Sequence, residues 1–128
     1  MKFLLQPKGL LLVISLLIIL FGLLTAGSAT DFHLHDTYFI VSHLYLYVLI
    51  GVFFLVQTAI YFLTDNYRQW RSIQYFHVAG AGFLVLVAIV FKKMPVLLLA
   101  IFTLGHILFI FNLITGFIRG KKVLNHVR

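Results

Sequence analysis

Residues Leu4 to Ala26 read LLQPKGLLLVISLLIILFGLLTA, and this run of leucine, isoleucine and valine decides the class of fold. A helix needs about 20 apolar residues to cross the hydrocarbon of a bilayer. The first apolar run covers about 4–26, and three more cover about 39–63, 73–91 and 95–118. Short polar linkers join the four runs. Pro95 suits the first position of the last helix. The sequence therefore predicts a single domain over 1–128, an all-α bundle of four transmembrane helices.

The composition of the chain excludes an ordinary soluble protein. Of its 128 residues, 62% are apolar and 10% are charged, whereas soluble domains carry about 25% charged residues. The sequence has no cysteine, which excludes disulfides and thiolate metal sites such as zinc ribbons or iron–sulfur clusters. Any metal must therefore be held by histidine, by carboxylate or within a cofactor.

The charged side chains predict how the helices are oriented, because cytoplasmic loops carry an excess of lysine and arginine. Only Lys92 and Lys93 fall on one side of the predicted bundle. The other side carries the remaining cations, which are Lys2, Lys8, Arg68, Arg71, Arg119, Lys121, Lys122 and Arg128. We therefore expect both termini in the cytoplasm, in a membrane such as the bacterial inner membrane. The first run also has features of a signal peptide, but it exceeds the usual length of a signal core, so we expect it to stay as a helix.

Residues His35 to His43 read HDTYFIVSH, at the predicted outer mouth of the second helix. This segment resembles one in subunit I of the heme–copper oxidases, where an outer loop leads into a helix. One helix before the segment and two after it are similar in order and orientation to the last four helices of subunit I. The resemblance implies that His43 is the axial ligand of a heme. It also implies that His35 and Asp36 lie above the heme propionates and help to hold a magnesium ion.

The chain departs from that family at positions that matter for catalysis. Two residues after the heme ligand, the family has a second histidine that binds a low-spin heme, and Tyr45 stands there in this chain. A phenol is a poor axial ligand for such a heme. The family's copper ligands lie on helices that have no counterpart here. We therefore expect no oxidase activity from this chain on its own, and we assign it no catalytic residues.

The predicted second helix carries a stripe of side chains that begins about five residues into the span, at His43. Helical spacing places the following residues along it: His43, Tyr47, Ile50, Phe54, Gln57 and Tyr61. A neutral imidazole can ligate iron, and Tyr47 can pack against a porphyrin. The alternative is that the stripe is a seam between helices, with His43 hydrogen-bonded to a neighbour.

Two other histidines fall inside predicted spans. His106 lies near the middle of the fourth span, where ionisable residues usually face the bundle interior. It is a candidate second ligand that would pair with His43 on one heme, although a lone hydrogen-bonded histidine also explains it. His77 precedes the small residues Ala79 to Gly82, which usually mark close contact between helices. We therefore interpret His77 as a polar residue at a helix–helix interface.

The loop before the second helix carries a third group of candidate ligands. His33, His35 and Asp36 form an HxHD pattern, which could bind a divalent cation through nitrogen and oxygen atoms. Asp36 could instead accept hydrogen bonds from backbone N–H groups near Phe39 and cap the helix. The sequence favours capping and propionate-type hydrogen bonds over a tight metal site.

The resemblance also bears on assembly and partners. Subunit I is built from similar four-helix arcs around a pseudo-threefold axis, so it implies that this chain is one arc. Because closed cyclic symmetry is common, we expect a homo-oligomer, with a trimer favoured. Two hypotheses about function follow: a heme-binding membrane protein for electron transfer or redox sensing, or a heme-free accessory subunit of a larger respiratory complex. The basic C-terminal tail is expected to meet anionic lipids, and no nucleic-acid partner is expected.

Overall fold

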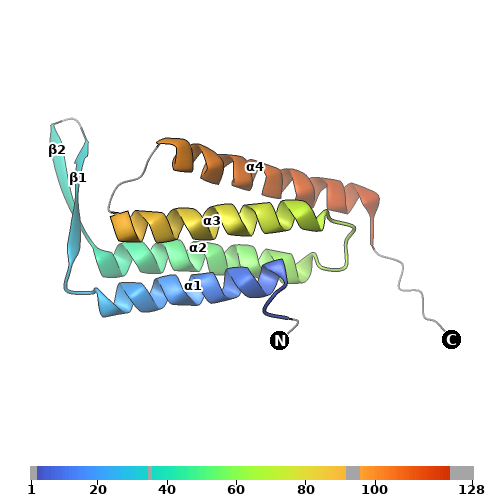
Figure 1. The fold of residues 1–128 in the computed structure, drawn as a ribbon, viewed down its shortest axis with the longest axis horizontal. Helices are drawn as coiled ribbons and strands as arrows, with labels where there is room; N and C mark the ends of the chain where they lie inside the picture. The colour runs from blue at the N-terminus through green and yellow to red at the C-terminus, as the bar shows by residue number, and fades with distance from the viewer. Residues whose placement is uncertain (1–2, 35, 92–95, 122–128) are drawn as a thin grey trace. The chain divides into compact units, whose positions relative to one another are not determined.

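The computed structural model of the chain describes residues 3–34, 36–91 and 96–121, with side chains at 30, 32–34 and 83–99 excepted. Its elements follow the order α1 (Pro7–Leu24), β1 (Ala29–Leu34), β2 (Thr37–Ser42), α2 (His43–Leu63), α3 (Arg71–Phe91) and α4 (Val96–Arg119) (Figure 1). Three helical stretches among the described residues are long and apolar enough to cross a membrane: Pro7–Leu24, His43–Leu63 and Ala100–Arg119. The chain is thus mostly helical, as its apolar runs predict.

The helix boundaries differ from the predicted ones for local reasons. α1 begins at Pro7 rather than at residue 4, because proline's fixed φ suits the first turn and its missing N–H is not needed there. Within α1, the Ser15 hydroxyl donates to the Leu11 carbonyl at 2.6 Å, so this buried polar group is satisfied inside its own helix. Pro95, predicted to open the fourth helix, lies outside the described residues, and α4 is described from Val96.

An antiparallel hairpin stands where the sequence predicted a linker and the first turn of a helix. β1 and β2 pair from Ala29 opposite Ser42 to Leu34 opposite Thr37. The predicted start of the second helix at residue 39 is therefore wrong, because α2 begins at His43. The segment 37–42, TYFIVS, is rich in β-branched and aromatic side chains, which favour a strand. Pairing with β1 also gives its backbone groups partners that a lone extended segment would lack.

The chain divides into two compact units, Met1–Ala59 and Ile60–Arg128. The first unit contains α1, the hairpin and most of α2. Its two helices approach closely at glycines. A Cβ atom on Gly22 would come within 2.8 Å of the Tyr47 Cβ, and one on Gly51 would overlap the Ile19 side chain. Small residues allow this close packing in membranes, where dispersion contacts between helices replace the hydrophobic effect.

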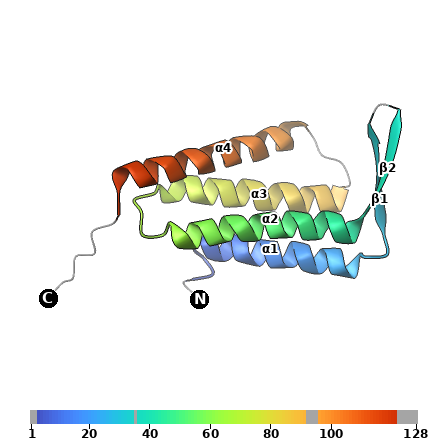
Figure 2. The same ribbon diagram turned by 180° about the vertical axis from the view of Figure 1, so that it is seen from behind.

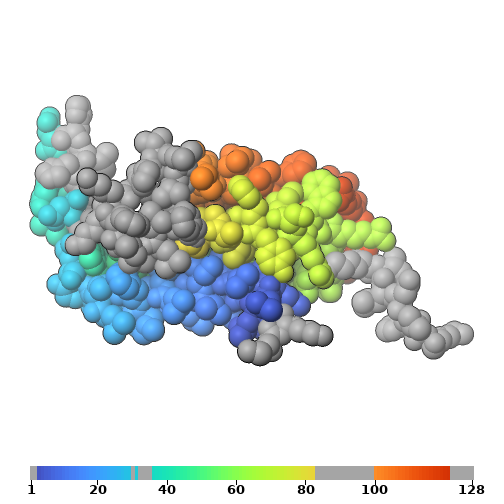
Figure 3. All heavy atoms as spheres, in the orientation of Figure 1, coloured from blue at the N-terminus to red at the C-terminus, as the bar shows by residue number. Residues whose placement is uncertain are grey.

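The second unit contains the end of α2, α3 and α4. α3 and α4 run side by side in both ribbon views (Figures 1 and 2). In the space-filling view, α4 (orange to red) lies directly against the described part of α3 (Figure 3). Val78 and Ala81 of α3 and Phe109 of α4 are buried, and the Phe109 ring stacks on His77 of α3. Gly80 faces Ile101, whose side chain would lie 3.6 Å from an added Cβ.

Candidate functional site

His43 is the first residue of α2, at the base of the hairpin. Its backbone N–H donates to the Ser28 carbonyl at 2.9 Å, which ties the base of the hairpin together. The Ser42 hydroxyl donates to the Ala26 carbonyl at 3.4 Å. The prediction that His43 lies five residues inside the second span is therefore wrong, because the preceding residues are in β2. His43 is half-buried at the end of the helix.

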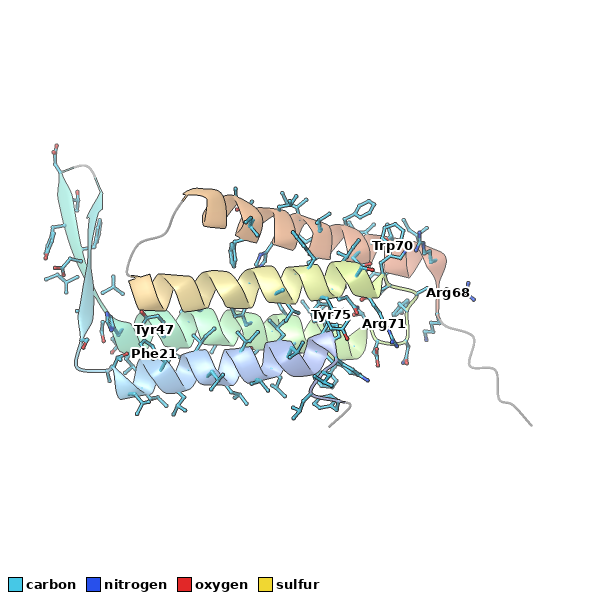
Figure 4. The ribbon with its side chains drawn as sticks, in the orientation of Figure 1. Phe21, Tyr47, Arg68, Trp70, Arg71 and Tyr75 are labelled. Atoms are coloured by element: carbon cyan, nitrogen blue, oxygen red, sulfur yellow. The ribbon has the colours of Figure 1, made fainter. Side chains whose placement is uncertain are left out.

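One aromatic ring contacts His43, and that ring contacts α1 in turn. The His43 and Tyr47 rings meet edge to face, with their centroids 5.4 Å apart. Phe21 of α1 meets Tyr47 in the same way at 5.1 Å, and Figure 4 shows these two residues together near the hairpin. The structure thus brings together two predicted site residues, His43 and Tyr47. Phe21 was missed, because the sequence shows no register between α1 and α2.

The burial of the α2 stripe indicates where a planar iron cofactor could reach His43. Around α2, Gly51 and Tyr47 face α1, and this side is filled. On the stripe of His43, Phe54 is fully buried, whereas His43 and Ile50 are partly exposed. A porphyrin ligated by His43 would therefore lie at the hairpin end of the stripe, with Tyr47 at its edge.

The tip of the hairpin holds the other candidate ligands of the first unit. Asp36 lies at the turn between β1 and β2, while His35 and the His33 side chain lie outside the described part of the chain. Asp36 does not cap α2, because the six residues of β2 separate it from that helix. Six residues of strand span about 20 Å, so contact between Asp36 and a heme on His43 has no support within one chain. Among the described residues, no group of three or more acidic or histidine side chains could hold a metal ion.

One hydrogen bond links the strands of the hairpin through their side chains. The Tyr38 phenol donates to the Asp31 carboxylate across the sheet. This bond and partial desolvation raise the pKa of Tyr38 above its usual value of 10.0, and the negative charge of Asp31 adds to the effect. The two residues occupy diagonal positions on the pair of strands, since Asp31 lies opposite Ile40 and Tyr38 opposite His33.

A second histidine cluster lies inside the second unit. His77 is fully buried, as expected for a residue at a helix–helix interface. Its Nδ1 lies 2.9 Å from the Tyr61 hydroxyl, and the Phe109 ring stacks on its face at 4.6 Å. Gly105 of α4 lies beside it, where an added Cβ would sit 3.7 Å from the His77 Cα. The backbone of α4 at Gly105 therefore lies directly beside His77, and an added Cβ would be in ordinary van der Waals contact with it.

His106 borders the same cluster. Its ring centroid lies 4.8 Å from that of His77, with the planes nearly perpendicular. Its Nδ1 lies 2.9 Å from the Phe102 carbonyl, and this hydrogen bond forms only when Nδ1 carries the proton. That tautomer leaves the lone pair on Nε2, the atom that a ligating histidine would use. His106 belongs to the second unit and His43 to the first, so their pairing on one heme stays a prediction.

No protein-family model, no curated protein and no solved structure matches this chain. The resemblance to oxidase subunit I therefore depends on the HDTYFIVSH segment and the order of the apolar runs.

Proposed function

We propose that the chain is a heme-binding integral membrane protein related to heme–copper oxidase subunit I, which carries electrons or senses redox state. The observation that carries this proposal is the position of His43. A half-buried imidazole stands at the end of an apolar helix, beside Tyr47 and inside the segment that resembles the oxidase heme ligand. A neutral histidine imidazole is a suitable axial ligand for iron.

In this proposal each residue near His43 has a distinct task. The His43 imidazole binds the cofactor, and Tyr47 packs against its edge. Phe21 fixes the orientation of the Tyr47 ring from α1. The heme, when bound, supplies reversible one-electron chemistry, and the protein tunes it through ligand identity and burial. His106 is the proposed second ligand, supplied either by the same chain or by another copy.

The proposed arrangement in the membrane follows from the charges and the apolar helices. We place the four helices as a transmembrane bundle with both termini in the cytoplasm, in a bacterial inner membrane. The face of α2 that bears Tyr45, Leu49, Val52 and Val56 is exposed. We propose that copies of the chain associate there as a homotrimer, so that each His43 site is completed by a neighbour.

A reduced-minus-oxidised absorption spectrum tests the proposal. Protein is purified after expression with added heme, alongside His43→Gly and, as a matched control, His126→Gly in the basic tail. We expect sharp heme bands in the wild type and in His126→Gly. His43→Gly should lose them and regain them when free imidazole is added. A colourless wild type, or equal bands in both variants, would contradict His43 ligation.

The second hypothesis is a heme-free accessory subunit of a respiratory complex, and the second unit favours it. There, Tyr61 and the Phe102 carbonyl hydrogen-bond to His77 and His106, which shows histidines used as packing and hydrogen-bonding groups. The absence of a histidine at Tyr45 points the same way. Co-purification with other membrane subunits, together with a colourless chain, would support this hypothesis over the first.

A further inference from the structure

One end of the second unit carries a fixed group of cations, which we name the basic cap: residues 67–71, before and at the start of α3, and residues 116–121, at the end of α4. Arg68, Trp70 and Arg71 lie together at this end of the unit (Figure 4). Four cations in the cap are exposed: Arg68, Arg71, Arg119 and Lys121. In the sequence from residue 60 onward, the one carboxylate side chain is that of Asp65.

The Asn112 side chain fastens the two halves of the basic cap. Its Oδ1 accepts the backbone N–H of Trp70 at 2.9 Å, and its Nδ2 donates to the Trp70 carbonyl at 3.2 Å. Asn112 is buried, so both bonds are largely shielded from competing water. The loop before α3 is therefore held against α4 at a defined register.

A short backbone pairing brings three of the cations into one place. The Arg68 N–H donates to the Gly120 carbonyl at 3.2 Å, and Tyr67 forms an antiparallel bridge with Lys121. Gly120 has a φ of 74°, a left-handed conformation that lets the chain leave α4 and turn back toward Tyr67. Arg68 consequently lies beside the segment from Arg119 to Lys121.

Aromatic side chains of the basic cap fit the boundary between lipid and water. The Arg119 guanidinium lies 4.1 Å from the centre of the Trp70 ring. Tyr67 meets Phe117 at 4.6 Å between ring centroids. Tryptophan and tyrosine concentrate at the headgroup level of membranes, and α2 and α4 both end here with apolar stretches long enough to span a bilayer.

We propose that the basic cap is a binding site for the phosphate of an anionic phospholipid. Arginine guanidinium groups bind phosphate oxygens through paired hydrogen bonds, and Arg68 and Arg119 lie on adjoining backbone segments. The acyl chains would extend along the apolar helices while Trp70 and Tyr67 border the glycerol region. This site lies in the second unit and does not depend on heme binding at His43.

The test measures lipid binding by the intact, detergent-solubilised protein. Phosphatidylglycerol, phosphatidylcholine with the same acyl chains, and inorganic pyrophosphate are each titrated and followed by native mass spectrometry. Fluorescence of Trp70, which is the chain's single tryptophan, gives a second readout at the site. The variant is Arg68→Gln/Arg119→Gln, and Arg119→Lys keeps the charge. The control, Lys92→Gln/Lys93→Gln, removes two charges outside the basic cap.

We expect saturable binding of phosphatidylglycerol and no saturation with phosphatidylcholine. Each cation near anionic lipid contributes about 1 kcal/mol, so loss of two weakens binding by about thirtyfold. The control Lys92→Gln/Lys93→Gln should bind as the wild type does. Arg119→Lys keeps the charge but lacks the paired donors of a guanidinium, so its affinity should lie between those of the wild type and the double variant. Equal loss in the control would show an effect of net charge and overturn the proposal. Tight binding of pyrophosphate would overturn the lipid as ligand and point to a soluble anion.

Discussion

His43 and His77 are both histidines in apolar helices, yet their surroundings differ in kind. His43 is the first residue of α2 and is half-buried. Its ring meets that of Tyr47 edge to face, with the centroids 5.4 Å apart. His77 is fully buried within the second unit, bonded to Tyr61 and stacked on Phe109. The first imidazole is placed at the edge of its unit, whereas the second is built into a core.

The difference distinguishes the proposed binding histidine from a structural one. A core imidazole with a hydrogen bond on one nitrogen and rings on its face stabilises packing, and its loss should lower stability. An imidazole at a helix end contributes less to packing and can accept a large ligand. Substitutions at the two histidines and around them test whether one serves binding and the other stability.

The largest expected effect comes from His77→Ala. The change leaves a cavity beside Phe109 and removes the partner of the buried Tyr61 hydroxyl. We expect a loss of about 3 kcal/mol in the free energy of unfolding. Equilibrium unfolding in mixed micelles measures it, with Phe76→Ala, an exposed position on α3, as the control. If His77→Ala lost no more free energy of unfolding than the control, His77 would not stabilise the core of the second unit.

Next in size is the effect of Asn112→Leu, which keeps the volume but removes both hydrogen bonds to Trp70. The Trp70 N–H would lose its partner, while the Trp70 carbonyl would keep the hydrogen bond from the Gln74 N–H at 3.3 Å. The loss should cost about 2 kcal/mol, and the fluorescence of Trp70 should shift as the loop leaves α4. Thr115→Ala, which removes one bond to the Asn112 carbonyl, is the matched control. An unchanged Trp70 spectrum in Asn112→Leu would mean that the basic cap is held by other contacts.

Gly22→Ala tests the close packing of α1 against α2 in the first unit. The new methyl group would lie 2.8 Å from the Tyr47 Cβ and push the ring that borders His43. Overpacking offsets the gain in helix propensity, so we expect a net loss of about 1 kcal/mol and lower heme retention. Gly27→Ala, whose added Cβ meets nothing within 4 Å, should change neither. Equal heme retention in both variants would show that Tyr47 does not contact the heme.

The smallest expected effect concerns the hairpin and alkaline pH. Because the pKa of Tyr38 is raised in the folded protein, its bond to Asp31 stabilises the hairpin below pH 10.0. That contribution is lost as pH rises through the folded pKa. In Asp31→Asn the pKa of Tyr38 should fall toward its usual value, measured by ultraviolet titration against Tyr38→Phe. Asp36→Asn at the turn should leave it unchanged, and an equal shift there would point to general charge instead.

The sequence predicts the helices better than it predicts the segment that joins them. Long apolar runs specify membrane-length helices with little competition, and Pro7 shows where α1 begins. TYFIVS is short, apolar and continuous with α2, so periodicity alone cannot distinguish strand from helix there. The alternation of apolar Phe32 and Leu34 with His33 and His35 was the available sign of a strand.

The candidate sites were predictable only in part, for a related reason. The oxidase-like segment directs attention to His43, and the depth of His106 in an apolar run directs attention to that residue. The contacts of His77 with Tyr61 and His106 depend on how α3 lies against its neighbours within the second unit. A single sequence does not specify which residues of two helices face each other, so these contacts could not be predicted.

The most direct measurement is the heme content per folded chain of His43→Ala and His77→Ala, purified side by side after expression with added heme. Helical circular dichroism establishes how much of each variant is folded. The account predicts that His43→Ala keeps its stability but loses heme. It predicts that His77→Ala loses stability while its folded fraction keeps heme at the wild-type ratio. Heme retained without His43, or lost only without His77, would contradict the assignment of the binding histidine to the first unit.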